Sequence, residues 1–185
     1  MITVVEDYKD YRPPDSVRRT IEKLLSGLPE PYHSGLESVV LTNAAAVGRG
    51  RTNRIRGRKY YRRDCRGFYH SRGEGGKPWI EIIVDNVIAD TPPTAIKVPL
   101  IREMIFADTL FHEVGHHLNA TLGTLARGEE SSAERWRKRL ARSYFRKRYW
   151  YLSPLLWVFQ ALFGRIMRRK IEAVERRYST DGRNA

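Results

Sequence analysis

The chain has 185 residues, 41% hydrophobic and 30% charged, a composition that indicates one folded domain and excludes a disordered chain. Its single cysteine, Cys65, excludes an intrachain disulfide framework and a cysteine-rich zinc site. Lys and Arg number 34 against 21 Asp and Glu, and the resulting net charge of +13 favours polyanionic partners without indicating any chemistry.

The first predicted element is a helix that begins after Pro13 and Pro14, with Asp15 or Ser16 as its cap and Gly27 at its end. Apolar residues recur at helical spacing, which is typical of a helix that buries one face. These residues are Val17, Ile21, Leu24 and Leu25.

About three strands are expected next. Residues 36–42 (LESVVLT) favour a strand, and residues 60–70 favour a second strand that is broken at Gly67. The Gly- and Arg-rich residues 48–59 between them predict a mobile loop. The strongest strand pattern is Trp79 to Val84 (WIEIIV), where Ile80, Ile82 and Val84 form an apolar face opposite Trp79, Glu81 and Ile83.

Two helices complete the predicted order. Pro99 suits a first helical turn, so a long helix is expected from there to about Asn119, and another begins near Glu129. Strands followed by helices predict an α+β fold with a small mixed or antiparallel sheet of about three strands. We expect residues 1–148 to form the domain and residues 149–185 an apolar and basic helical extension.

The extension contains one apolar stretch, residues 149–164 (YWYLSPLLWVFQALFG). A membrane-spanning helix needs about 20 apolar residues, so this stretch is short, and basic residues flank both of its ends. The pattern fits a helix packed on the domain or a partner, or one that lies at a membrane surface. Since no secretory signal is visible, the expected location is cytoplasmic, with a peripheral membrane position as the alternative.

The motif that carries chemistry is His112-Glu113-Val114-Gly115-His116, inside the long predicted helix. Histidines four residues apart share a helix face, and two imidazoles so placed can bind one tetrahedral Zn²⁺. Glu113 lies to the side, where its carboxylate can take a proton from a water on the metal. Three of the five histidines fall at positions 112, 116 and 117, which a metal-free helix does not explain. The sequence therefore predicts one zinc per chain.

A catalytic zinc needs a third protein ligand, and because no histidine follows His117, the downstream candidates are Glu129, Glu130 and Glu134. Here the sequence resembles the gluzincin metallopeptidases, whose H-E-x-x-H motif is followed by a Glu in an E-x-x-A-D-like helix. Residues 130–134 (ESSAE) match that pattern with Glu in place of Asp, and Gly115 matches an H-E-hydrophobic-G-H variant.

The resemblance covers roughly Trp79 to Arg142 and implies a sheet packed on a zincin-type active-site helix. It implies Glu130 as the third ligand and Glu134 as the acceptor of a hydrogen bond from a ligand imidazole. Glu134 and Glu129 are the alternatives for the third ligand. The basic residues 135–139 (RWRKR) depart from the small or apolar continuation expected in that family.

In zincin-type peptidases an edge strand beside the motif helix pairs with the substrate as an additional strand. The resemblance makes one strand the candidate: Trp79, Ile80, Glu81, Ile82, Ile83 and Val84. His117 points about 100° away from His116 around the helix, which favours a core or surface residue over a role at the substrate site or in contact with a metal ligand. Asp108, one turn before His112, is interpreted as a solvated residue, with a role beside the metal as the alternative.

Two segments are strongly basic, residues 49–77, in which aromatic residues are interleaved, and residues 135–148. Both fit a solvated surface, and the alternatives are nucleic acid and an anionic membrane surface.

The favoured hypothesis is a zinc-dependent metallopeptidase, a hydrolase of peptide or protein substrates with Glu113 as general base. The first alternative is a nucleic-acid-binding module with a structural zinc, for which a base beside the metal has no use. The second is a peptidase at a membrane surface, anchored through residues 149–170.

Overall fold

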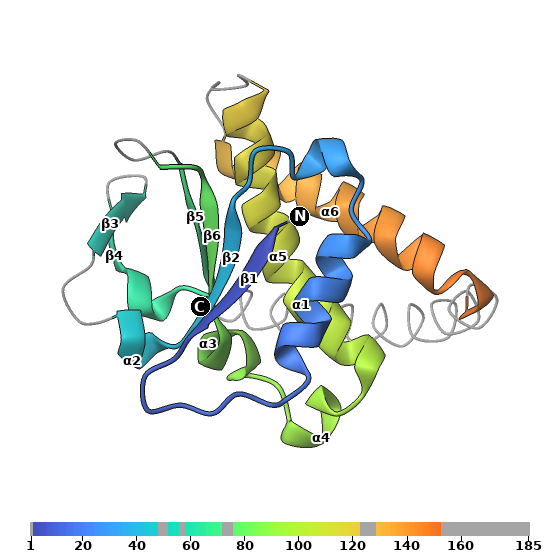
Figure 1. The fold of residues 1–185 in the computed structure, drawn as a ribbon, viewed down its shortest axis with the longest axis horizontal. Coiled ribbons are helices and arrows are strands. Elements are labelled where there is room, and N and C mark those ends of the chain that lie inside the picture. The colour runs from blue at the N-terminus through green and yellow to red at the C-terminus, as the bar shows by residue number, and fades with distance from the viewer. Residues whose placement is uncertain (1, 48–51, 56–57, 72–75, 123–128, 153–185) are drawn as a thin grey trace, which may run out of the picture. The chain divides into compact units, whose positions relative to one another are not determined.

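The computed structural model describes residues 2–47, 52–55, 58–71, 76–122 and 129–152. Its framework is a four-stranded sheet in the order β1-β2-β6-β5 (Figure 1). β1 (Thr3–Asp7), β2 (Ser38–Thr42) and β6 (Trp79–Ile83) run parallel, and β5 (Gly67–His70) pairs with β6 antiparallel. The fold is therefore α+β with a mixed sheet, as predicted.

The sheet has one strand more than the sequence predicted, because β1 was missed. Val4 is the only buried residue of β1, and Val5 is exposed on the other face. β1 lies at one edge of the sheet, so it carries too few apolar residues to produce a strand pattern.

The predicted loop at residues 48–59 is in part wrong. Thr52–Ile55 (β3) and Arg58–Tyr61 (β4) pair as an antiparallel ribbon, whereas residues 48–51 and 56–57 lie outside the described part. The predicted strand at 60–70 is divided by the 3₁₀ helix η2 (Arg62–Asp64), and its second part begins at Gly67 as β5.

The predicted strand at Trp79 to Val84 is confirmed as β6, but it is not an edge strand. β2 pairs with one side of it and β5 with the other. Glu81 and Ile83, on the face opposite Ile80 and Ile82, are buried as well. A strand buried on both faces has a nearly continuous apolar sequence, which is the pattern of WIEIIV. The edge strand on this side of the sheet is β5.

Helices α1 (Val17–Ser26) and α5 (Pro99–Thr121) pack side by side on one side of the sheet (Figure 1). The predicted apolar face of α1 is buried, and Ser16 and Gly27 are its caps. Glu103 of α5 is buried, forms an ion pair with Lys23 of α1, and accepts a hydrogen bond from the Tyr144 hydroxyl at 3.1 Å. Tyr144 belongs to α6 (Glu129–Arg148), so one carboxylate joins three helices.

Short helices connect these elements: α2 (Ala44–Val47), α3 (Val84–Ile88), α4 (Pro93–Ile96) and the 3₁₀ helices η1 (Glu30–Tyr32) and η3 (Trp150–Leu152).

The chain divides into two units, residues 1–144 and residues 145–185, and the boundary falls within the sequence of α6. The predicted extension at residues 149–185, with its apolar stretch, lies outside the described residues from position 153 onward, so the domain boundary stays a prediction. Within the ranges that the structure covers, no helix has both the length and the apolar character needed to cross a membrane.

Helices α5 and α6 lie in close contact at Gly115. A Cβ atom on Gly115 would lie 2.7 Å from the carbonyl oxygen of Ala133 and 2.9 Å from its Cα atom. One turn further along α5, the buried Asn119 side chain accepts a hydrogen bond from the Ser132 hydroxyl at 2.8 Å. Only glycine permits this separation of the two backbones, because any side chain would displace α6.

We predict that Gly115→Ala destabilises the protein by about 1–3 kcal/mol, because overpacking forces the helices apart. The sign is informative, since the same change at an uncrowded helix position stabilises by about 1 kcal/mol. The free energy of unfolding is measured by urea denaturation. Gly76→Ala is the control, because a Cβ atom at Gly76 meets nothing within 4 Å. Equal stability of the two variants would contradict the crowding.

Candidate metal centre

Two imidazoles converge on one side of α5, as the spacing of the motif predicts. The Nε2 atoms of His112 and His116 lie 3.2 Å apart, and the rings are nearly perpendicular at 82°. Their side chains are 22% and 18% exposed, respectively. The two nitrogens are thus close enough to share one ion and open enough to receive it.

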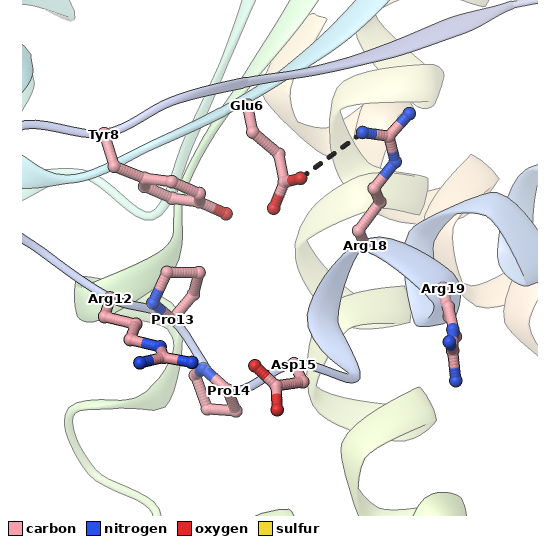
Figure 2. Close-up of a pocket in the computed structure, with 8 residues that line it drawn as sticks. All are labelled: Glu6, Tyr8, Arg12, Pro13, Pro14, Asp15, Arg18 and Arg19. Carbon is pink, nitrogen blue, oxygen red and sulfur yellow. Dashed lines mark hydrogen bonds and ion pairs between the residues drawn. The ribbon is translucent and has the colours of Figure 1, made fainter.

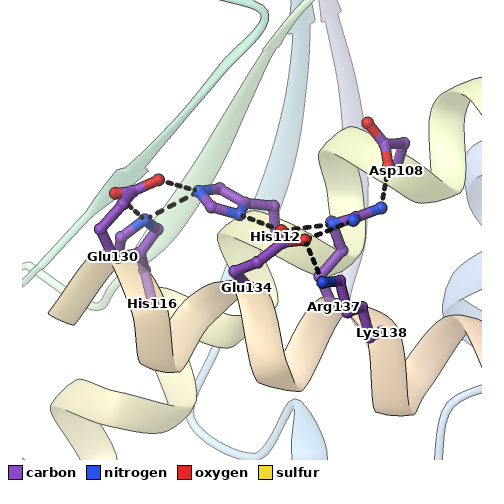
Figure 3. Close-up of polar contacts among 7 residues, drawn as sticks. All are labelled: Asp108, His112, His116, Glu130, Glu134, Arg137 and Lys138. Carbon is purple, nitrogen blue, oxygen red and sulfur yellow. Dashed lines mark hydrogen bonds and ion pairs between the residues drawn. The ribbon is translucent and has the colours of Figure 1, made fainter. Parts of the chain in front are cut away.

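Helix α6 brings Glu130 to the same place (Figure 3). Its Oε1 atom lies 3.0 Å from His112 Nε2, and its Oε2 atom lies 3.6 Å from His116 Nε2. One ligand atom from each of the three residues lies within 4.8 Å of the others. The structure therefore contains the His-His-Glu arrangement that the motif and the helix after it predict.

These three donors fit zinc. Two imidazole nitrogens and one carboxylate oxygen are the protein ligands of one class of catalytic zinc site, which leaves a fourth position for water or substrate. Glu130 is 49% exposed, so the group is accessible from solvent. Glu134, one of the alternative third ligands, lies near the other nitrogen of the His112 ring: its carboxylate is 3.9 Å from Nδ1, whereas Glu130 is near Nε2. The side chain of Glu129 lies outside the described part, and that alternative stays a prediction.

Glu113 differs from the histidines because it is buried, with an exposure of 7%. Its carboxylate accepts a hydrogen bond from the backbone N–H of Tyr69 in β5. The pKa of Glu113 is raised to about 8, first by burial and then by the negative charge of Glu130, while the Tyr69 hydrogen bond opposes both. A carboxyl group with such a pKa beside a metal-binding group is a candidate for proton transfer.

Strand β5 can lie against Glu113 because its first residue is glycine. A Cβ atom on Gly67 would lie 2.7 Å from Thr109 Cγ2 and 3.1 Å from both Cγ and Oε1 of Glu113. In the sequence Gly67 reads as an interruption of a strand. In the structure it is the point at which the edge strand β5 meets helix α5.

His117 is a core residue, 2% exposed, and points away from the two imidazoles of the metal group. Its Nε2 atom lies 3.0 Å from the carbonyl oxygen of Ser34, which can only accept, so Nε2 carries the proton. Nδ1 then accepts from the Tyr69 hydroxyl at 3.3 Å. Burial lowers the pKa of His117. His117 therefore joins α5 to β5.

A cluster of ion pairs adjoins His112 on the side of Glu134. Two nitrogens of Arg137 donate to the two carboxylate oxygens of Glu134, each at 2.6 Å, and a third donates to Asp108. The hydrogen bonds from Arg137 are the largest of the causes that lower the pKa of Glu134 to about 2. Asp108 is half exposed, as expected of a solvated residue, but it also forms an ion pair with Arg137. Arg137 was missed in the sequence, although its i,i+3 spacing from Glu134 is a detectable signal.

Two other features lie away from this group. On the opposite face of the sheet, the buried Glu81 pairs with Arg62 and His70, and the His70 ring stacks on Trp79 at 3.7 Å. A cavity of about 390 Å³ lies beside the start of α1 and contains none of the predicted site residues (Figure 2). It is lined by Glu6, Tyr8, Arg12, Pro13, Pro14, Asp15, Arg18 and Arg19.

Comparisons with protein-family models, with curated proteins and with solved structures find no match to this chain. The resemblance to gluzincins consequently rests on the motif and on the His112, His116 and Glu130 geometry alone.

We predict that Gly67→Ala destabilises the protein by about 1–3 kcal/mol, because the new methyl group overlaps Thr109 and Glu113. Thr109→Ser removes the nearest atom, Cγ2, so the double variant should recover part of the loss. Thermal unfolding of the two single variants and the double variant measures this. Strict additivity of the two changes would contradict the contact.

Proposed function

We propose that this protein is a zinc-dependent metallopeptidase in which His112, His116 and Glu130 hold the metal. The observation that carries the proposal is the convergence of these three side chains from two helices, with Glu113 buried next to His112. When bound, zinc supplies Lewis acidity, which polarises a carbonyl group and makes water more acidic.

In the proposed reaction Glu113 is the proton acceptor. Its carboxylate is held by the Tyr69 N–H, so the group is oriented before substrate arrives. Glu113 would act as a base in its ionised form, which a cation bound by His112, His116 and Glu130 would favour.

The substrate would pair with β5 and not with β6. β5 is the edge strand next to β6, and Gly67 and Tyr69 place it against Glu113. An extended peptide added to that edge would present its carbonyl groups beside the catalytic side chains.

The alternative of a structural zinc in a nucleic-acid-binding module is less consistent with this geometry. A structural site closes all four positions with protein ligands, whereas the described donors here number three. Burial of the Glu113 carboxyl group also costs folding free energy, and a structural zinc site would have no use for that group. The membrane-surface peptidase stays a prediction that flotation with anionic vesicles tests.

We predict that the purified protein contains about one zinc per chain, measured by mass spectrometry, and that His116→Ala loses most of it. Glu130→Ala should lose zinc during dialysis against a mild chelator, because only two imidazoles remain. Glu134→Ala should retain a substantial part, with affinity reduced about 10–100-fold. Glu129→Ala tests the remaining alternative ligand and should keep its zinc if Glu130 is the third ligand. Loss from Glu134→Ala but not from Glu130→Ala would transfer the ligand role to Glu134.

We predict that Glu113→Gln keeps both the fold and the zinc but lowers hydrolysis of a denatured protein substrate about 10²–10⁴-fold. The amide is nearly the same size as the carboxylate, but it cannot take the proton. Equal activity of the variant and the wild type would exclude Glu113 as the base while leaving the metal centre intact.

A further inference from the structure

The ion pairs beside the metal centre join three charged residues of two helices (Figure 3). Arg137 of α6 binds both carboxylate oxygens of Glu134 one turn earlier on the same helix. Its remaining terminal nitrogen reaches Asp108 of α5, 29 residues away in sequence. The guanidinium group is therefore held at both ends, by one carboxylate from each helix.

The network of Asp108, Glu134 and Arg137 lies on the Nδ1 side of the His112 ring. Nε2 of His112 faces His116 and Glu130, so Nδ1 is the nitrogen directed away from the metal group. That nitrogen lies 3.9 Å from Glu134 Oε2, within ion-pair reach but too long for a hydrogen bond. At this separation the Glu134 carboxylate acts on the imidazole through its charge, so its position sets the strength of the interaction.

A glutamate on an exposed helix face has several accessible rotamers, and Glu134 is 37% exposed. The two parallel hydrogen bonds from Arg137 select one of them, because a guanidinium fork matches a carboxylate in one plane. Lys138 also contacts Oε1, at 3.4 Å, but its ammonium group is largely exposed and makes a single contact. Arg137 is consequently the group that fixes Glu134.

We propose that Arg137 is a positioning residue for the metal centre: anchored by Asp108, it holds Glu134 in place beside His112 and thereby raises metal affinity. This inference rests on the proposed metal site. It assigns a role to the basic stretch after residue 134, in which this chain departs from the gluzincin pattern.

The effect expected of Arg137 is smaller than that of Glu134 itself. Removing a group that contacts a ligand imidazole costs about 10–100-fold in metal affinity. A residue that acts through such a group should cost less, about 3–10-fold, because Glu134 still visits the same position without it. Arg137→Lys should behave like Arg137→Ala, since a lysine keeps the charge but lacks the fork.

The test measures Zn²⁺ affinity of the full chain by competition with a chromophoric chelator. The variants are Arg137→Ala, Arg137→Lys, Glu134→Ala and the Arg137/Glu134 double alanine variant. Arg142→Ala is the control, because Arg142 is an exposed arginine of the same helix and has no ion pair with any described residue. Thermal unfolding of the metal-free proteins accompanies each titration, and the visible spectrum of the Co²⁺-loaded proteins reports the ligand geometry.

We expect Arg137→Ala and Arg137→Lys to bind zinc about 3–10-fold more weakly than wild type and Arg142→Ala to bind equally well. In the Glu134→Ala background the Arg137 change should have no further effect, which is the mark of action through Glu134. The inference would be overturned if the losses of zinc affinity in the double variant were additive, or if Arg137→Lys bound zinc as tightly as wild type. It would also be overturned if the lower affinity of Arg137→Ala were accompanied by unfolding of the metal-free protein. A wild-type chain that binds no zinc would instead refute the proposed function.

Discussion

The close contact of α5 with α6 at Gly115 and Ala133 is the constraint on which the metal centre depends. Because no side chain separates the two backbones there, α6 lies near enough for Glu130 to reach both imidazoles. The same contact brings Ser132 to Asn119 and Arg137 to Asp108, so polar pairs on both sides of the glycine hold the helices in register. A larger residue at position 115 would weaken all of these contacts together.

Strand β5 makes the corresponding contact on another side of α5. Gly67 allows it to lie on Thr109 and Glu113, the Tyr69 N–H binds Glu113, and the Tyr69 hydroxyl binds His117. Successive residues of the motif consequently face different neighbours. The histidines face the partly open side next to α6, while Glu113 faces the edge strand and is buried. In the proposed function, this division would separate metal binding from proton transfer within a single helical turn.

The charge around the candidate metal group is negative, although the net charge of the chain is positive. The chain carries a net charge of +13, yet three carboxylates gather around the imidazoles of His112 and His116. They belong to Glu113, Glu130 and Glu134. Such a group attracts a divalent cation, and repulsion by Glu130 adds to burial, the larger cause, in raising the pKa of Glu113. Arg137 and Lys138 offset the charge of Glu134, which leaves Glu130 as the carboxylate available to the metal.

The sequence by itself determined the features that arise from local periodicity: helices α1, α5 and α6, the strand β6, and the His112, Glu113 and His116 arrangement. Spacing along one helix is enough to place these side chains relative to one another. Tertiary structure alone decided which strand is the edge, because a buried strand such as Trp79–Ile83 has the same sequence pattern whichever neighbours pair with it. It also decided the contacts of Tyr69, the bridge from Arg137 to Asp108, and the presence of β1 in the sheet. Each of these joins residues far apart in the chain, and no spacing rule within one element encodes them.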